Sequence, residues 1–449
     1  MGTVGLSFGS ATSGQGFDVA STVTQIQASE QAIETPWQNQ LTALKAQDTA
    51  LSSLGTDLST LTTSVQALTD FSGIFSAKEG SSSNPDLLSL SSADATAQSG
   101  SHTITVSQLA QTSSDVSTAI SNASDTLSGS VTIQGTVFNI GSSDDTLATL
   151  SAAINSAAIG VSSSVITDSS GSRLSIVSGT SGAAGQLSIS SSLSGASSGA
   201  ITFQTGETGQ DANLTVDGVS VTSPSNTVSN AIPGVTFQLL ATSATPVQVQ
   251  ITNDTTDIAK AIGSFVTAYN AVVKDVNTQE GNDSSGNPEP LYGSPTMATI
   301  QSGLTGALFG GAASGSINNI TQLGLTLNDD GTSSLDSSTL TSVLNSNFSD
   351  VTGFMQNTGS FGQTLSTALN NLGTQAPNGA VYLAQQQNSS EESALNTDLT
   401  KENATLASQK TQLTTELNTA NEILQSIPSQ LNEVNEMYSA ITGYNQQKS

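Results

Sequence analysis

The sequence predicts an α+β protein, in which long terminal helices form a coiled-coil or bundle stalk and a mostly antiparallel β head is inserted in the middle of the chain. Two ladders of apolar residues at helical spacing lie at opposite ends of the 449-residue chain. Between them, from Gly80 to about Asp254, apolar and polar residues alternate instead, as they do on half-buried strands. A chain of this length has room for about three domains, each able to bury a core.

The N-terminal ladder predicts one apolar stripe on a long helix, because its residues recur mostly three, four or seven positions apart. Its members are Val19, Val23, Ile26, Ile33, Trp37, Leu41, Leu44, Leu51, Leu54, Leu58, Leu61, Val65 and Leu68. Within the ladder, Thr35 and Pro36 have the pattern of a helix N-cap followed by a first-turn proline. We therefore expect one helix to end there and another to begin.

The C-terminal ladder has the same spacing and predicts a second stripe. Its members are Leu395, Leu399, Leu406, Leu413, Leu417, Leu424, Ile427, Leu431, Val434, Tyr438 and Ile441. Pro428 removes one helix hydrogen bond, at a cost of about 3 kcal/mol, so we expect a joint there. Each stripe needs a partner, which is either the other stripe folded back on it or a second chain. The sequence leaves both possibilities open.

The central region predicts short strands joined by turns. Its strongest hairpin is formed by residues 214–216 and 219–221 around Asp217-Gly218, because an Asp-Gly pair suits a two-residue turn. Two further alternating runs are expected to extend the same sheet: Val235, Phe237 and Leu239, then Val247, Val249 and Ile251.

Residues 128–207 predict a hairpin, helix, hairpin unit that folds by itself. Alternating residues at 131–140 form the first strand pair, and Leu147, Leu150 and Ile154 give a short amphipathic helix. The second hairpin turns at residues 168–171.

Helical spacing returns after Asp254 and predicts that the stalk resumes there. The residues that show it are Ile258, Ile262, Phe265, Tyr269, Val272 and Val276. A polar loop is expected at 279–290, followed by shorter helices around 297–308 and 361–372, the second of which ends at Gly373.

The composition excludes several classes of partner and chemistry. Lys and Arg total 8 against 35 Asp and Glu, so the formal net charge is −27 and nucleic-acid phosphate would be repelled. Cysteine is absent, which excludes disulfides and cysteine-based sites, and the single His102 cannot form a histidine metal cluster. We expect no cofactor and no metal. No apolar run has the length of a membrane span, and the first residues lack the basic and apolar parts of a secretory signal.

Three polar patterns could in principle hold ions or reactive groups. Asn328-Asp329-Asp330-Gly331 resembles a calcium loop, but Thr326 and Ser337 occupy positions where an EF-hand needs acids, so we expect a hairpin turn. Asp144-Asp145 fits the acidic start of a helix, and His102 has no nearby Ser and Asp arrangement to form a triad. We therefore expect a structural protein and not an enzyme.

Several stretches follow one another in the order of a known family. The most specific are Asp217-Gly218, Ser225-Asn226-Thr227-Val228, Ala231-Ile232-Pro233-Gly234-Val235-Thr236 and Phe265-Val266-Thr267-Ala268-Tyr269-Asn270. Weaker ones are Gly16-Phe17-Asp18 with Pro36, Ser107-Gln108-Leu109-Ala110, and Leu323-Gly324-Leu325, while residues 145–185 resemble a repeat shared with flagellins. Together they resemble the bacterial flagellar filament cap family, also called hook-associated protein 2 or the FliD family.

The resemblance implies a division of the chain into four parts. The terminal legs are residues 1–40 with 410–449, and the helical stalk is 41–78 with 255–409. The β head is 79–127 with 208–254, and the outer head, similar to a flagellin repeat, is 128–207.

The resemblance also implies a homo-oligomeric ring, a pentamer in the family's usual picture, at the distal tip of the extracellular flagellum. Such a ring prevents the loss of flagellin and promotes its polymerisation. The implied partners are flagellin, the proteins of the hook–filament junction and an export chaperone at the C-terminal region. The implied export route is the flagellar type III system, without a cleaved signal peptide.

The residues expected to contact other subunits or the filament lie on the two helical stripes: Val19, Val23, Ile26, Ile33, Leu413, Leu417, Leu424, Leu431, Val434 and Ile441. Two other functions remain open at this point. One is a surface adhesin with a β head on a helical stalk, and the other is a different axial structural protein of the flagellum.

Overall fold

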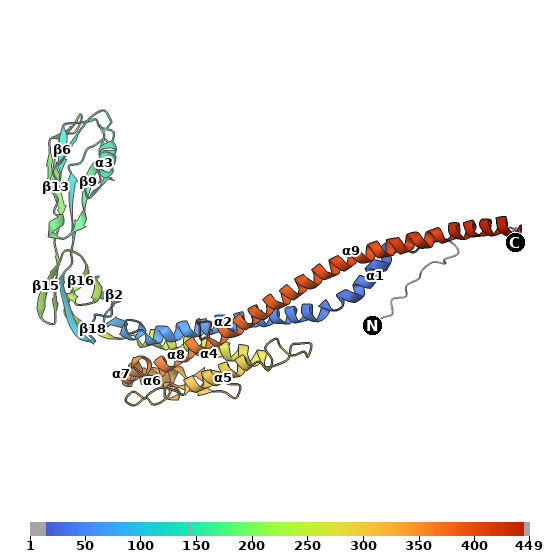
Figure 1. The fold of residues 1–449 in the computed structure, drawn as a ribbon. Coiled ribbons are helices and arrows are strands. Elements are labelled where there is room, and N and C mark those ends of the chain that lie inside the picture. The colour runs from blue at the N-terminus through green and yellow to red at the C-terminus, as the bar shows by residue number, and fades with distance from the viewer. Residues whose placement is uncertain (1–14, 144, 444–449) are drawn as a thin grey trace. The chain divides into compact units, whose positions relative to one another are not determined.

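The computed structural model describes residues 15–143 and 145–443, which divide into two compact units. The helical unit contains the chain up to Thr69 and from Ala261 onward, and the β unit contains Asp70–Lys260. Figure 1 shows the blue and red ends of the chain together in the helical unit, and the green centre folded into strands. The predicted α+β class, with helical ends and a β insert, is therefore confirmed.

Most elements of the helical unit are helices. Their bounds are α1 (Val19–Gln31), α2 (Glu34–Thr69), α4 (Thr255–Gln279), α5 (Pro295–Leu308), α6 (Ser337–Ser346), α7 (Phe348–Gln356), α8 (Phe361–Leu372) and α9 (Ala380–Thr442). The first residues of α4 belong to the β unit. The helical unit also contains a small hairpin formed by β19 (Leu325–Leu327) and β20 (Ser333–Leu335). The helices predicted after Asp254 and around 297–308 and 361–372 are confirmed, and Gly373 follows α8 as expected.

The break in the N-terminal helix lies two residues earlier than expected. α1 ends at Gln31 and α2 begins at Glu34, so Thr35 is not the N-cap. Pro36 nevertheless lies in the first turn of α2, where its missing N–H removes no helix hydrogen bond.

The expected joint at Pro428 is wrong, because α9 continues through this residue as one helix of 63 residues. A proline removes a single backbone donor, and the neighbouring turns stay helical. The hydroxyls of Ser426 and Ser429 donate to the carbonyl oxygens of Ile423 and Ser426, which adds hydrogen bonds on either side of the proline.

The core of the helical unit lies where α2 meets the shorter helices. Leu54 and Leu58 of α2 are fully buried. Phe361 of α8 stacks on Phe354 of α7, with ring centroids 5.1 Å apart, and meets Phe265 of α4 edge-on at 6.3 Å. Aromatic pairs in these geometries add to the stabilisation from burial itself, so this end of the unit is firmly packed.

The β unit consists of strands with one short helix. Its elements are β1 (Lys78–Ser82), β2 (Leu88–Ala93), β3 (Gly100–Gln108), β4 (Thr112–Ser117), β5 (Leu127–Ser128), β6 (Ser130–Ile133), β7 (Thr136–Asn139), α3 (Leu147–Ser156), β8 (Val161–Asp168), β9 (Gly171–Ser181), β10 (Ile189–Ser191), β11 (Leu193–Gly195), β12 (Gly199–Ile201), β13 (Phe203–Glu207), β14 (Ala212–Val216), β15 (Val219–Ser223), β16 (Thr227–Ile232), β17 (Val235–Leu239) and β18 (Ser243–Asn253). The two hairpins predicted at Asp217-Gly218 and at 168–171 are confirmed by the registers of β14 with β15 and β8 with β9.

The first β core lies between two antiparallel sheets, ordered β1-β18-β3-β14-β15 and β16-β17-β2. The prediction that β17 extends the same sheet as β14 and β15 is wrong. β18 joins β14 through β3 as expected, but β17 pairs with β2 and β16 in the second sheet. Alternation along β17 shows that Phe237 is buried, yet it cannot show which strand lies beside it.

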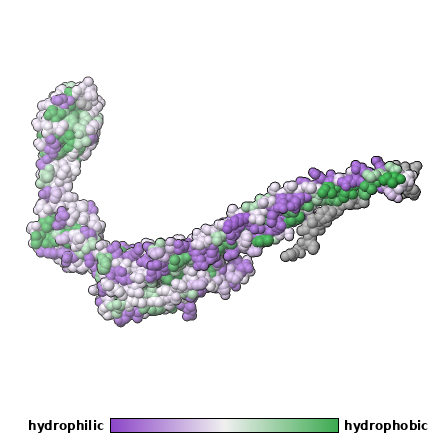
Figure 2. Space-filling view, in the orientation of Figure 1, coloured by the Kyte–Doolittle hydropathy of each residue, from purple (hydrophilic) through white to green (hydrophobic). Residues whose placement is uncertain are grey.

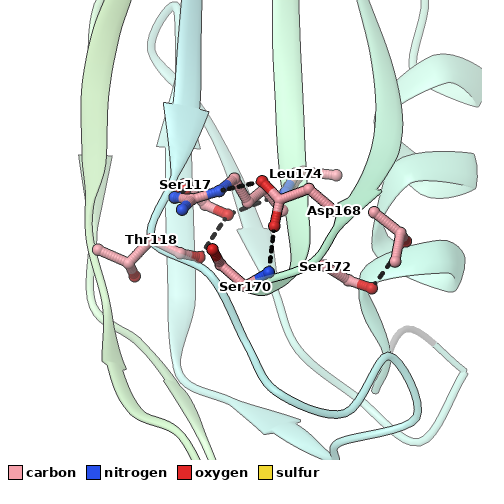
Figure 3. Close-up of polar contacts among 8 residues, drawn as sticks. Ser117, Thr118, Asp168, Ser170, Ser172 and Leu174 are labelled. Carbon is pink, nitrogen blue, oxygen red and sulfur yellow. Dashed lines mark hydrogen bonds and ion pairs between the residues drawn. The ribbon is translucent and has the colours of Figure 1, made fainter.

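The second β core contains α3 and the four-stranded sheet β13-β4-β9-β8, with two small sheets completing it. The ladder between β4 and β9 ends at Val116 and Ser175, and the next N–H, that of Leu174, donates to Ser117 Oγ at 2.8 Å. Figure 3 shows this buried hydroxyl also donating to Thr118 O at 3.0 Å. A side chain thus continues the ladder where the backbone diverges.

Replacing Ser117 should therefore weaken the second β core. In Ser117→Ala the buried Leu174 N–H loses its acceptor, at an expected cost of about 1–3 kcal/mol in the free energy of unfolding. Urea denaturation followed by circular dichroism measures this, with the exposed Ser162→Ala as a control expected within about 0.5 kcal/mol of the unmodified chain. Equal stability of Ser117→Ala and Ser162→Ala would contradict the assigned role.

A carboxyl group of α4 should destabilise the helical unit at neutral pH. Burial raises the pKa of Asp275, as does the negative charge of Asp57, and Asp275 Oδ2 has no hydrogen-bond partner. A raised pKa in the fold means that the stabilising protonated form is lost as pH rises through it. Asp275→Asn should therefore raise the melting temperature at pH 7, and the gain should vanish below about pH 4, where Asp is protonated even when unfolded.

The control is a carboxyl group whose removal should change the melting temperature at pH 7 in the opposite direction. Hydrogen bonds from Ser338 and Thr339 at the start of α6 lower the pKa of Asp336 to about 2. Asp336→Ala should lower the melting temperature at pH 7, with a loss that shrinks as pH falls from about 4 towards 2. If Asp275→Asn also lowers the melting temperature at pH 7, the charge at this position is not the destabilising feature.

Candidate assembly surface

α9 packs antiparallel against α1 and α2 along a line that we call the seam, and Figure 1 shows α2 and α9 side by side there. Its polar contacts, from the start of the chain inward, are Phe17 N–H to Asn421 Oδ1 at 2.9 Å, Gln27 Nε2 to Leu406 O at 2.8 Å, and Asn388 Nδ2 to Asp48 Oδ1 at 2.9 Å. Positions on α9 fall as those on α1 and α2 rise. The two predicted stripes therefore partner each other within the chain over much of their length.

A buried polar pair sets the register of the seam. Asn388 is 9% exposed, and its hydrogen bond to Asp48 can form only when α2 and α9 are aligned as they are. Sliding the helices by one turn would leave the buried amide of Asn388 without this partner, which costs about 1–3 kcal/mol.

The predicted contact residues at the N-terminal end are mostly used inside the chain. Val19 and Val23 are buried, and Ile26 is half-buried. Ile33 differs, because it lies in the break between α1 and α2 and is 58% exposed. Val19 and Val23 are thus core residues of the seam, and Ile33 alone of these four is available to another molecule.

The predicted contact residues on α9 change from covered to exposed towards its C-terminal end. Leu413, Leu417 and Leu424 are half-buried, whereas Leu431 is 45%, Val434 60% and Ile441 78% exposed. The change occurs where α1 ends its run beside α9, at the contact with Asn421. Gly16 lies against both Asn421 and Gln425, and the predicted contact residues that follow on α9 are the exposed ones.

The exposed end of α9 carries more apolar residues than the sequence ladder identified. Ile423 and Met437 are also largely exposed, and they lie one position before Leu424 and Tyr438. Their own spacing of fourteen, two heptads, is the signal that could have found them. We call the resulting surface the distal stripe: Ile423, Leu424, Ile427, Leu431, Val434, Met437, Tyr438 and Ile441. Figure 2 shows hydrophobic side chains gathered along this end of α9.

At the break between α1 and α2, an apolar side chain is exposed and a carboxylate side chain is buried. Apolar Ile33 is exposed, while Glu34 is only 5% exposed and its Oε1 has no hydrogen-bond partner. Glu30, in the last turn of α1, also has one buried carboxylate oxygen without a hydrogen-bond partner. Unpaired buried carboxylates are costly, so the seam is less stable at this break than along α2.

The polar patterns considered in the sequence have structural roles. Asn328–Gly331 forms the predicted turn between β19 and β20, and Asp330 accepts hydrogen bonds from the N–H and hydroxyl of Thr332. These bonds lower the pKa of Asp330. Asp145 lies just before α3, whereas Asp144 lies outside the described residues.

His102 holds a turn of the first β core. Asp217 accepts hydrogen bonds from Thr103 N–H and from His102 Nδ1, both at 2.8 Å, and these bonds lower the pKa of the Asp217 carboxyl. Asp217 has φ 51° and Gly218 φ 81°, the left-handed pair that a tight hairpin turn requires. The only histidine of the chain therefore fixes β14–β15 against β3.

Two further features are absent from the described residues. No group of three or more His, Asp and Glu side chains in 15–143 and 145–443 is arranged to hold a metal ion. No described helix combines the length and the apolar character needed to cross a bilayer.

Comparison with known proteins agrees with this arrangement. The family models described as the N-terminus and the C-terminus of flagellar hook-associated protein 2 match residues 15–113 and 209–439. B-type flagellar hook-associated protein 2 of Pseudomonas aeruginosa is 28% identical over 322 residues, 63% of this chain and 67% of that protein. Flagellar hook-associated protein 2 of Escherichia coli K12 is 29% identical over 371 residues, 75% of this chain and 78% of that protein.

A solved structure has the same fold over most of the chain. The flagellar cap protein FliD of Escherichia coli, in a crystal structure of its D1, D2 and D3 domains, aligns with a TM-score of 0.57 at 26% identity. The alignment covers 76% of this chain and 99% of that one. The family matches, the relatives and the shared fold agree, and the chain belongs to the flagellar hook-associated protein 2 family.

Proposed function

We propose that this protein caps the bacterial flagellar filament. Copies of the chain form a ring at the distal tip, retain exported flagellin beneath it and promote its polymerisation into the filament. The observation that carries the proposal is family membership across both halves of the chain, together with a relative of the same fold that is described as a flagellar cap protein. The role is structural, with no covalent chemistry.

Within the ring, each of the four predicted parts of the chain has its own role. Residues 1–40 with 410–449 are the legs, 41–78 with 255–409 the stalk, 79–127 with 208–254 the β head, and 128–207 the outer head. The boundary between the two compact units and the separation of the two β cores support this division. We propose a pentamer, in which the β heads form a plate over the growing end.

The legs make the contacts between subunits and with the filament. Support comes from the exposed side chain of Ile33 and from the distal stripe, whose side chains are exposed or half-buried. Val19 and Val23 act in the same contacts only indirectly, by fixing α1 on α9. Flagellin and the hook–filament junction proteins are the further partners, and an export chaperone binds the C-terminal region before export through the flagellar type III system.

Deleting the gene tests the function directly. We expect short or missing filaments and flagellin monomers in the culture medium, both reversed by the intact gene. Flagellin is measured in the medium and on the cells by immunoblotting. Normal filaments without leakage would contradict the capping role. If the deletion strain also lost adherence, the alternative function as a surface adhesin would be favoured.

Ending the chain after Glu422 tests the legs separately from the rest. The truncated chain keeps the contact between Phe17 and Asn421 and loses the whole distal stripe. We expect flagellin leakage like that of the gene deletion, because the exposed contacts of the legs are gone. Melting of the β unit at an unchanged temperature is the control for folding. Normal filament length with this chain would show that the legs are dispensable.

A further inference from the structure

The second β core contains a carboxyl group that is buried without full hydrogen bonding. Asp115 lies on β4, which runs between β9 and β13, and it is only 7% exposed. Its partners across the sheet are Ile176 on β9 and Thr205 on β13, so these three side chains lie on one face. Ile176 is fully buried, and Asp115 Oδ1 has no hydrogen-bond partner. An ionisable oxygen is therefore enclosed beside the apolar core.

The neighbouring polar side chains on the same face of β4 are paired. Ser113 and Ser117 lie two residues on either side of Asp115 and are buried like it. Ser113 Oγ accepts the Leu187 N–H at 3.1 Å, and Ser117 Oγ accepts the Leu174 N–H at 2.8 Å. Each of these hydroxyls thus serves a backbone group. Asp115 differs, because its Oδ1 serves none.

Among the described residues, no basic side chain on the adjacent strands faces Asp115. Between the start of β4 and the end of β13 the sequence has one basic residue, Arg173. It lies three positions before Ile176 on β9, and therefore on the opposite face of that strand. Its Nε lies 3.6 Å from Asp168 Oδ2, and its Nη1 donates to Ser117 O at 3.3 Å. The positive charge of Arg173 is thus engaged by other groups.

The other charged groups around this core are acids. Those among the described residues are Asp125, Asp145, Asp168 and Glu207. Asp211 accepts the Ala183 N–H at 2.7 Å, beside the short helix η2 (Ala183–Gly185) that packs on β4. α3 and β10 carry no charged residue. The ionised form of Asp115 therefore gains no support from an opposite charge.

Burial makes the proton affinity of Asp115 differ between the folded and unfolded chain. It raises the pKa of the Asp115 carboxyl, while a hydrogen bond from the Thr205 side chain lowers this pKa to a smaller extent. A raised pKa means that the fold binds the proton more tightly than the unfolded chain does. The resulting stability is complete below the ordinary Asp pKa of about 3.9 and is lost as pH rises through the pKa in the fold. At neutral pH the core then encloses an unpaired charge.

We propose that Asp115 is a proton-sensitive switch of the second β core. In its ionised form it promotes local opening of the strands around β4, and in its protonated form it holds them together. If the chain is exported, this core is easier to unfold in a neutral cell interior than in more acidic surroundings. That consequence rests on the proposed function, whereas the switch itself does not.

Amide hydrogen exchange of the purified full-length chain tests the switch, because it measures local opening. Exchange is followed by mass spectrometry at pH 7 and at about pH 4.5, still above the ordinary Asp pKa, and is expressed relative to the intrinsic rate at each pH. In Asp115→Asn, protection of β4 and β9 at pH 7 should rise by about fivefold or more, the lower end of the effect of an unpaired buried group. The gain should shrink at about pH 4.5, where more of the unmodified chain is protonated at Asp115.

Two variants on β13 separate charge from packing. Thr205→Val removes the hydroxyl that bonds the Asp115 carboxylate, so protection of β4 and β9 should fall at pH 7 and recover towards about pH 4.5. Glu207→Gln removes an exposed charge on the same strand and should leave this protection and its pH dependence unchanged. Asp115→Ser is a second variant at the site, because Ser113 and Ser117 are accommodated on the same face, and it should show the same gain as Asp115→Asn.

The absence of a gain at pH 7 in both Asp115 variants overturns the proposal. A gain of equal size at both pH values also overturns it, because packing and not charge would then be the cause. Failure of the switch is distinguishable from failure of the capping role, since exchange is measured on the purified chain. Normal filaments in the deletion strain would contradict capping, and the pH dependence of exchange would stand.

Discussion

The burial of one face of α9 against α1 and α2 is the constraint on which the helical unit depends. α9 has 63 residues and is about 95 Å long, and most of the stability of a helix in a protein comes from packing of its apolar face and not from intrinsic helix propensity. α2 supplies the packing partner from Gly55, which lies beside Val381, past Asp48, which bonds Asn388, and the start of the chain extends it to the contact between Phe17 and Asn421. Among the described residues, the apolar side chains towards the C-terminal end of α9, from Leu431 to Ile441, are exposed.

Polar side chains, more than ion pairs, define the details of the fold. With only 8 basic residues the acids cannot be matched by opposite charges, and many accept backbone N–H groups at turns and helix starts instead. Asp217, Asp330 and Asp336 all do so, and their pKa values are lowered as a result. Asp275 and Glu34 are the counterexamples: each has a buried oxygen without a partner, and both lie between long helices. A buried carboxylate oxygen without a partner costs free energy, and the raised pKa of Asp275 makes part of that cost depend on pH.

The chain is built as an insertion within an insertion. The β unit lies between α2 and α4, and the second β core lies between β3 and β14 of the first. The family matches follow the same division, since they cover 15–113 and 209–439 and leave out most of the second core. The helical ends and the first core are therefore the parts that carry the family resemblance. Within the helical unit, the packing of α1 and α2 on α9 brings N-terminal and C-terminal segments of the chain side by side.

The sequence by itself determined the fold class, the extent of the helical and β regions, the tight turns and the apolar stripes, because each depends on local periodicity or on residues that few conformations tolerate. Only the tertiary structure decided which of those residues are covered. Val19 and Val434 have the same spacing signal, yet one is buried and the other exposed, because α1 ends its run beside α9 at Asn421. The sheet that β17 joins and the unbroken course of α9 through Pro428 were decided in the same way. Periodicity specifies a face, whereas a neighbour distant in sequence decides what that face contacts.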